Sequence, residues 1–194
     1  MSISKGSRFR SWDSADRCIK IKIFPSKVGI KNSIFWLFDG VLRFGAYTML
    51  GDCMVVKYTD KELELLARLM RAEAVGEGNL GMLMVGNVGI NRVLAHCLTF
   101  KDITTISQMI YQSPGGFSGT SSSLFYGNPT EMEKNLARRV IRGEYYYPAT
   151  NALWFYAPTQ GESCKSTWWD QALAGSYKNH CFYKPASGIC NELH

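Results

Sequence analysis

The chain has 194 residues, of which 46% are hydrophobic and 13% aromatic, and its formal net charge is +6. This length and apolar share fit one globular domain with an appendage. Residues 1–53 hold nine Lys/Arg and four Asp, a balance of +5, whereas residues 54–194 hold thirteen Lys/Arg and twelve Asp/Glu. Because the larger part is nearly neutral, we expect no nucleic-acid partner.

The first 53 residues differ in pattern from the rest. Residues 20–23 alternate Lys and Ile, which is typical of a short strand. Residues 34–50 are apolar, but Asp39 and Arg43 interrupt them and the stretch is too short for a membrane span. It also lies too far along the chain for an ordinary signal peptide. We therefore expect no transmembrane segment and no secretory signal.

A helix is predicted from about residue 60 to residue 75. Thr59 and Glu62 have the spacing of a capping box, in which each side chain bonds the backbone of the other residue. Apolar residues, among them Leu66 and Met70, then recur at helical spacing. The pattern indicates an amphipathic helix with one buried face.

Glu73 lies three residues after Met70 and seven after Leu66, and therefore on the apolar stripe of this helix. Burial there removes water from the carboxyl group and raises its pKa, as a general acid requires. Glycines at positions 76 and 78 turn the chain directly afterwards. The competing interpretation is a solvated residue at a helix end or one partner of a local salt bridge.

A second helix is predicted over residues 80–94 and a short third one over residues 102–111, with Asp102 as its cap. A loop rich in Gly and Ser follows at residues 113–123. Three glycines of the second helix would allow a neighbouring element to approach closely: Gly81, Gly86 and Gly89.

Pro129 predicts the start of a further helix, as the residue at its first position, and Gly143 predicts its end. Short strands are predicted at residues 152–156 and 181–183. Together these elements predict a helix-rich α+β domain over residues 54–194, with its short strands in the C-terminal part.

The six cysteines form no CxxC pair, so a structural zinc site is not expected. Without a secretion signal, buried thiols are the preferred interpretation, and a disulfide among the last three is the alternative. The cysteines are Cys18, Cys53, Cys97, Cys164, Cys181 and Cys190.

Six blocks of sequence follow one another in a recognisable order: residues 66–78, 81–92, 108–112, 136–144, 153–158 and 179–183. In this order they resemble the SleB/CwlJ family of cell wall hydrolases over residues 54–194. The run Gly-Asn-Val-Gly-Ile-Asn-Arg at 86–92 and the run His-Cys-Phe-Tyr at 180–183 are most similar to its CwlJ branch, the spore cortex-lytic enzymes. The loop at 114–119 is richer in glycine than that branch would suggest, so the wall of the cleft is expected to differ.

The resemblance implies a lysozyme-like catalytic fold with the glutamic acid at Glu73 as its acid. It implies degradation of cortex peptidoglycan during germination, at the boundary between spore coat and cortex. It also implies a spore-coat partner protein and calcium dipicolinate as the trigger. Neither a cofactor nor a metal is expected.

The resemblance also suggests an origin for residues 1–53. CwlJ-like chains begin near the position of Met54, so the preceding residues are predicted to be a translated extension upstream of the native start. Residues 50–52 can be encoded by a purine-rich ribosome-binding sequence just before the Met54 codon. Mass spectrometry of the native N-terminus tests this, and peptides from residues 5–45 in spores would refute it.

Glycosidases usually combine two carboxylates, and Glu77 is the only evident partner for Glu73, although its place in a glycine-containing turn favours a structural role. We therefore prefer a lytic-transglycosylase-like mechanism, in which Glu73 acts as both general acid and general base. A hydrolytic glycosidase, an N-acetylmuramoyl-L-alanine amidase and a non-catalytic spore-coat structural protein stay open. A zinc amidase has little support, because the histidines are only His96, His180 and His194.

Several further residues are predicted to bind substrate or to support the acid. Aromatic rings can stack on the CH faces of sugars, while amides can bind acetamido groups or brace a carboxyl group; core packing and backbone bonding are the alternatives. The set is Glu77, Asn91, Tyr111, Gln112, Phe117, Tyr156, Trp168 and His180, with Trp154 and Trp169 as further aromatic candidates.

Overall fold

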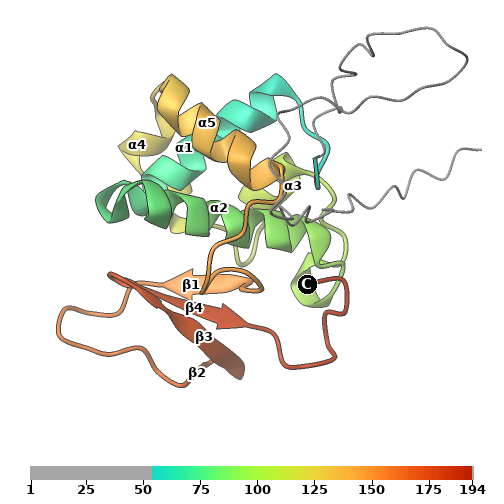
Figure 1. Ribbon diagram of the computed structural model, residues 1–194, viewed down its shortest axis with the longest axis vertical. Helices are drawn as coiled ribbons and strands as arrows, with labels where there is room; N and C mark the ends of the chain where they lie inside the picture. The colour runs from blue at the N-terminus through green and yellow to red at the C-terminus, as the bar shows by residue number, and fades with distance from the viewer. Residues whose placement is uncertain (1–53, 194) are drawn as a thin grey trace, which may run out of the picture. The chain divides into compact units, whose positions relative to one another are not determined.

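A computed structural model describes residues 54–193, in which a layer of helices lies on a four-stranded sheet (Figure 1). The predicted strand at 20–23, the apolar stretch at 34–50 and the extension as a whole lie outside these residues. Within the described part, no helix has the length and apolarity needed to cross a membrane. The helices are α1 (Asp60–Ala74), α2 (Gly78–Leu94), α3 (Ile106–Ile110), α4 (Ser123–Tyr126) and α5 (Glu131–Ile141), with 3₁₀ turns η1 (Val75–Glu77), η2 (Leu98–Phe100) and η3 (Ser118–Ser121).

Helix α1 begins and ends close to the predicted bounds. The Thr59 side chain accepts from the Glu62 amide at 3.2 Å, and the Glu62 carboxylate accepts from the Thr59 amide at 3.1 Å, so the capping box is confirmed. Leu66 and Met70 are fully buried, as the apolar stripe predicts. The buried face of α1 packs against α2 and α5, which orients its last turn.

Helix α2 is buried on all sides from Gly81 to Val93, as expected of a helix between two layers. Figure 1 shows α1 and α5 on one side of it and the sheet on the other. The close approaches predicted at two glycines are confirmed: a Cβ on Gly86 would lie 3.0 Å from the Met70 sulfur, and one on Gly89 would lie 3.0 Å from Met109. Gly81 faces Glu77, in the turn before its own helix, and a Cβ on Gly81 would also lie 3.6 Å from Tyr177 of the sheet.

Two predicted helix starts are wrong by a few residues. Helix α3 is capped by Thr105, whose side chain accepts from the Gln108 amide at 3.1 Å, and not by Asp102. Helix α5 is capped by Thr130 in the same manner, so Pro129 precedes the cap instead of occupying the first helical position. In both places a Thr with a Glu or Gln three residues later forms a capping box, which outweighs the single Asp or Pro signal.

The sheet is antiparallel, with the strand order β1-β4-β3-β2. Its strands are β1 (Trp154–Tyr156), β2 (Thr167–Trp168), β3 (Gln171–Tyr177) and β4 (His180–Lys184), so two were predicted and two were missed. Phe182 of β4 is fully buried against Met84 and Val88 of α2, which joins the sheet to the helical layer. The observed helix-rich α+β architecture confirms the predicted class.

Four cysteines form two disulfides, so the expectation of buried thiols is wrong for them. Cys97 pairs with Cys190 and Cys164 pairs with Cys181, each with the two Cα atoms 5.6 Å apart. The partners are 93 and 17 residues apart in the sequence, and spacing alone does not show which backbones meet. Cys18 and Cys53 lie outside the described residues.

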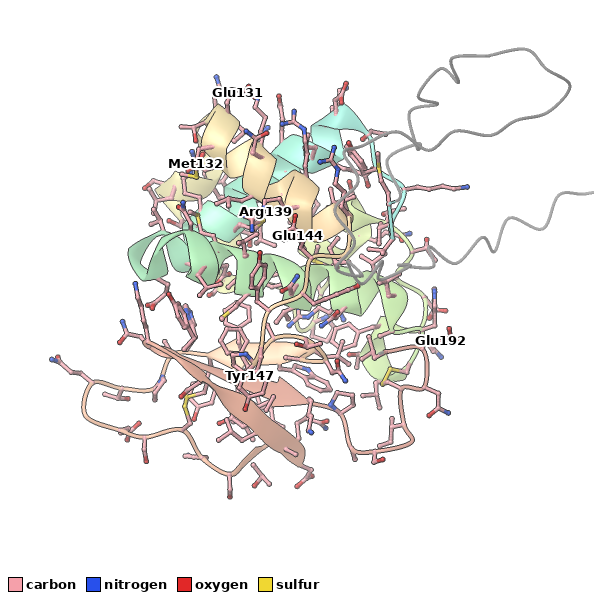
Figure 2. All side chains as sticks on the ribbon, viewed as in Figure 1. Glu131, Met132, Arg139, Glu144, Tyr147 and Glu192 are labelled. Atoms are coloured by element: carbon pink, nitrogen blue, oxygen red, sulfur yellow. A yellow bond between two sulfur atoms is a disulfide. The ribbon has the colours of Figure 1, made fainter. Side chains whose placement is uncertain are left out.

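The segment between α5 and the sheet is tied to α2 by polar side chains. The Asn87 amide group donates to the Glu144 carbonyl at 2.7 Å, and its oxygen accepts from the Tyr146 amide at 2.9 Å. Arg139 of α5 pairs with the Glu144 carboxylate at 2.9 Å, and Figure 2 shows the two side chains next to each other. These contacts fix the path by which the chain reaches β1.

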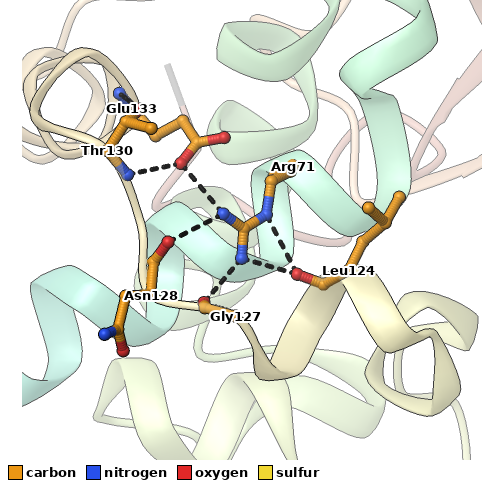
Figure 3. Close-up of polar contacts among 6 residues, drawn as sticks. All are labelled: Arg71, Leu124, Gly127, Asn128, Thr130 and Glu133. Atoms are coloured by element: carbon orange, nitrogen blue, oxygen red, sulfur yellow. Dashed lines mark hydrogen bonds and ion pairs between the residues drawn. The ribbon is translucent and has the colours of Figure 1, made fainter.

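Arg71 of α1 organises the segment that leads from α4 into α5 (Figure 3). Its guanidinium donates to the carbonyls of Leu124, at 2.6 and 2.9 Å, of Gly127, at 2.6 Å, and of Asn128, at 3.0 Å. It also pairs with the buried Glu133 carboxylate at 3.2 Å. One side chain thus holds three carbonyls and a carboxylate, two residues before Glu73.

Replacing Arg71 by alanine should lower the free energy of unfolding by about 3 kcal/mol, because Glu133 then stays buried without its cation. Denaturant unfolding measures the loss. Arg68→Ala is the matched control, since Arg68 lies on the same helix and pairs with Glu64 at 3.8 Å on the surface. Such a pair contributes at most about 1 kcal/mol, so equal losses would contradict the prediction.

Candidate active site

A cavity of about 630 Å³ opens beside the last turn of α1. Glu73 lines it from α1, and Arg92 lines it from α2. Its other walls come from segments far apart in the sequence: the loop at 116–119 with Ser122, the end of β1 with Ala157, and His180 of β4. The cavity therefore lies where the helical layer, the Gly/Ser-rich loop and the sheet meet.

The Glu73 carboxyl group is held by the loop opposite it. The Gly119 amide donates to its Oε1 at 2.5 Å, and the Ser118 hydroxyl lies 3.5 Å from its Oε2. A Cβ on Gly119 would lie only 2.8 Å from Oε1, so a larger residue here would force the carboxyl group to shift. The Gly/Ser-rich composition of the loop thereby allows a backbone donor to reach the acid.

Burial raises the pKa of Glu73 above its ordinary value, while the Gly119 amide, the Arg92 charge and the Ser118 hydroxyl act in the opposite direction. The rise from burial prevails. The group therefore keeps its proton to a higher pH than an exposed glutamic acid, and it is half-buried at the edge of a cavity. Such a carboxyl group can donate a proton to a bound molecule and take one back.

Arg92 is a site residue to which sequence reasoning assigned no role. It is 5% exposed, and it donates to the Leu153 carbonyl at 2.8 Å and to the Gly115 carbonyl at 3.2 Å. Its guanidinium lies 4.3 Å from the centre of the Phe117 ring. Burial lowers the pKa of Arg92 to about 10, so it stays charged at neutral pH. The available signal was that Arg92 is the only charged residue in the helix Gly78–Leu94.

Glu77 lies on the other side of the turn and lines no part of this cavity. It is 6% exposed, and its Oε1 accepts from the Asn179 side chain at 3.0 Å. Lys178 donates to its backbone carbonyl at 2.7 Å. Glu77 thus joins η1 to the turn between β3 and β4, and it is not brought together with Glu73 in the cavity.

Three other predicted residues also lie away from the cavity lining. The Asn91 amide group donates to the carbonyls of residues 149, 150 and 152, and so braces the chain before β1. Gln112 donates to the Thr99 carbonyl at 3.2 Å. Tyr111 is 61% exposed and packs edge-on against Phe125.

Phe117, Tyr156 and His180 do line the cavity with Glu73. Burial lowers the pKa of His180, against the opposing charge of Glu77, so the ring is neutral near pH 7. The ring packs edge-on against Phe155 at 5.1 Å, and its Nδ1 has no hydrogen-bond partner among the described residues. Over residues 54–193, no three His, Cys, Asp or Glu side chains group as a metal site would require.

A second cavity of about 500 Å³ adjoins the first and shares Arg92, Gly116 and Phe155 with it. Trp168, the remaining predicted residue, lines this second cavity together with Trp169. Trp154, a further aromatic candidate, lines it as well. The two cavities thus adjoin, with Glu73 in the first and three tryptophan rings in the second.

Comparison with known proteins gives consistent matches. Residues 76–183 match a family model described as Cell Wall Hydrolase. The chain is 56% identical over 139 residues to the cell wall hydrolase CwlJ of Oceanobacillus iheyensis, covering 72% of this chain and 97% of that protein. It is 28% identical over 128 residues to a spore cortex-lytic enzyme of Bacillus cereus, covering 66% of this chain and 46% of that protein.

The fold matches a solved structure described as the catalytic domain of the germination-specific lytic transglycosylase SleB from Bacillus anthracis. The TM-score is 0.51 with 26% sequence identity, covering 66% of this chain and 97% of that one. The match confirms the lysozyme-like fold that the sequence resemblance implied.

Proposed function

Since the chain belongs to the SleB/CwlJ family of cell wall hydrolases, we propose that it cleaves the glycan strand of spore cortex peptidoglycan during germination, with Glu73 as its general acid and base. The names of two relatives, a spore cortex-lytic enzyme and a germination-specific lytic transglycosylase, support the substrate and the reaction. The observation that carries the proposal is the Glu73 carboxyl group, which keeps a raised pKa at the edge of a cavity.

In the proposed reaction, protonated Glu73 gives its proton to the glycosidic oxygen as the bond between that oxygen and the sugar C1 breaks. The carboxylate then takes the proton of the same sugar's 6-hydroxyl, whose oxygen bonds to C1 and closes an anhydro ring. Glu73 ends protonated, as it began, and the atoms balance without water.

The surroundings of Glu73 support a mechanism with one carboxyl group. Among the described residues that line the two cavities, Glu73 is the only acid. Burial stabilises the protonated form of Glu73, which donates the proton in the first step. The Gly119 amide and the Arg92 charge stabilise the carboxylate, which takes a proton in the second step.

Mass spectrometry of the fragments that the wild-type protein releases from cortex peptidoglycan tests the proposed reaction. We expect anhydro-muramic ends. Reducing ends would instead indicate a hydrolytic glycosidase, and free stem peptides would indicate an N-acetylmuramoyl-L-alanine amidase. A protein that releases nothing would be a structural component of the spore coat, which contradicts the proposal.

We further propose that residues 54–194 are the catalytic domain and act at the boundary between coat and cortex, with a spore-coat partner protein and calcium dipicolinate as the trigger. The family membership supports this placement. Spores whose only copy of the protein carries Glu73→Gln should fail to lose cortex on addition of calcium dipicolinate. Normal cortex loss in those spores would contradict the proposal.

A further inference from the structure

The turn between β2 and β3 carries a residue that its backbone does not favour. Trp169 and Asp170 occupy its two central positions, with φ values of 47° and 62°. A two-residue hairpin turn with both φ values positive prefers Asn, Asp and Gly. A bulky tryptophan in this left-handed region is strained, and backbone strain of this kind is typical of residues whose side chains have a functional role.

The Trp169 ring is held at the surface. It is 73% exposed, and it stacks on the Trp168 ring with the ring centres 4.5 Å apart and the planes inclined by 14°. Both rings line the second cavity. A large flat ring held in place beside a cavity and left uncovered is typical of a ligand-binding surface.

The aromatic surface adjoins the cavity that holds Glu73. Tyr156 lines the Glu73 cavity, and its ring centre lies 4.7 Å from that of Trp168 in the second cavity. The two cavities also share Phe155 as a common wall. The rings therefore lie within reach of a polymer that is bound across Glu73.

The chemistry of the second cavity suits a sugar ring better than a charged peptide. Among the described residues that line it, Arg92 is the only charged one, and its guanidinium already donates to two backbone carbonyls. The rest of the wall is largely aromatic or aliphatic. Flat rings match the CH faces of a pyranose, whereas the carboxylates of a stem peptide would find a single cation there, which is 5% exposed.

We propose that the second cavity is a sugar-binding subsite for the part of the glycan strand next to the cleaved bond, with the Trp169 indole as its stacking surface. This inference rests on the proposed function, because it assumes that a glycan strand crosses Glu73. It goes further than that function because it assigns the sugar next to the cleaved bond to the second cavity and to Trp169.

Binding of peptide-free glycan strands, measured by calorimetry in the Glu73→Gln background, tests the subsite without cleavage. Adding Trp169→Asn should weaken binding about tenfold, as the loss of an aromatic anchor does. The melting temperature should stay equal or rise, since Asn is favoured at this turn position. Trp169→Phe, which keeps a ring, should lose less binding than Trp169→Asn.

Tyr147→Ala is the control, because Tyr147 lies in the segment between α5 and β1 (Figure 2), is 76% exposed and lines neither cavity. It should bind glycan as the parent does. Equal binding with and without Trp169→Asn would overturn the proposed subsite but not the proposed function. Weaker binding together with a lower melting temperature would overturn it in the same way, because the loss would then come from a damaged fold. Weaker binding only of strands that carry stem peptides would assign the cavity to the peptide. A parent that binds no glycan at all overturns the proposed function as well.

Discussion

Replacing Glu73 by glutamine should reduce the release of cortex fragments by roughly a thousandfold or more, because an amide can neither give nor take the proton that the reaction needs. The fold should persist. Glutamine has the shape of glutamic acid, and its side-chain oxygen can accept from the Gly119 amide as Oε1 of Glu73 does at 2.5 Å. Fragment release from purified cortex, together with a thermal unfolding curve, measures both effects.

Glu77→Gln is the matched control for this loss. It makes the same chemical change four residues further on, at a side chain that contacts Asn179 and lines neither cavity. Its release of fragments should stay close to that of the wild type. Full activity in the Glu73 variant, or an equal loss in the Glu77 variant, would show that the acid has been misassigned.

The same Glu73 variant should differ from the wild type in how stability depends on pH. Burial raises the pKa of Glu73 in the folded protein above its ordinary value of 4.5, which applies to the unfolded chain. Folding therefore favours the protonated form, and the contribution of this group to stability is lost as pH rises through the raised pKa. Glutamine carries no such dependence. The melting temperature of the variant minus that of the wild type should be smallest below pH 4.5 and should increase as the pH rises.

Local sequence patterns were sufficient to predict α1 and the position of Glu73 on its buried face. The capping box at Thr59 and the spacing from Leu66 to Met70 involve residues within one helix, so no distant contact is needed to interpret them. That some neighbour approaches Gly86 closely was also predicted, because a glycine in a buried helix permits it, but the sequence did not show that this neighbour is Met70.

Features that depend on distant segments could not be predicted from these patterns. The Gly119 donor reaches Glu73 across 46 residues, and Arg92 is placed by carbonyls from two different loops. Strand β3 lacks a run of β-branched residues and is formed by pairing with β4, so its own sequence is a weak signal. The family resemblance implied that Glu73 is the acid, but neither cavity could be inferred before the sheet was placed.

Removing the Cys97–Cys190 disulfide should have the largest effect on stability of the changes proposed for this chain. This bond closes a loop of 93 residues, and the entropy that it removes from the unfolded chain is equivalent to about 4.5 kcal/mol. The double variant Cys97→Ala/Cys190→Ala should therefore melt roughly 15 °C lower. Thermal unfolding under oxidising conditions measures the difference. A reducing agent should lower the melting temperature of the wild type by more than that of the variant, which keeps only the Cys164–Cys181 bond of the two described disulfides.

The second disulfide provides an internal comparison. Cys164–Cys181 closes only 17 residues, for which the same relation gives about 3 kcal/mol, so Cys164→Ala/Cys181→Ala should cost less. A larger loss there would mean that lost packing at the fully buried Cys181 outweighs the entropy of loop closure. The Cys97 bond also anchors the segment from which Leu98 and Thr99 line the second cavity. Its loss should therefore weaken binding of glycan strands even at temperatures where the variant is folded. The Cys164→Ala/Cys181→Ala variant is the control, and it should bind glycan as the wild type does at such temperatures. Equally weakened binding in both variants would mean that lost stability alone causes the effect.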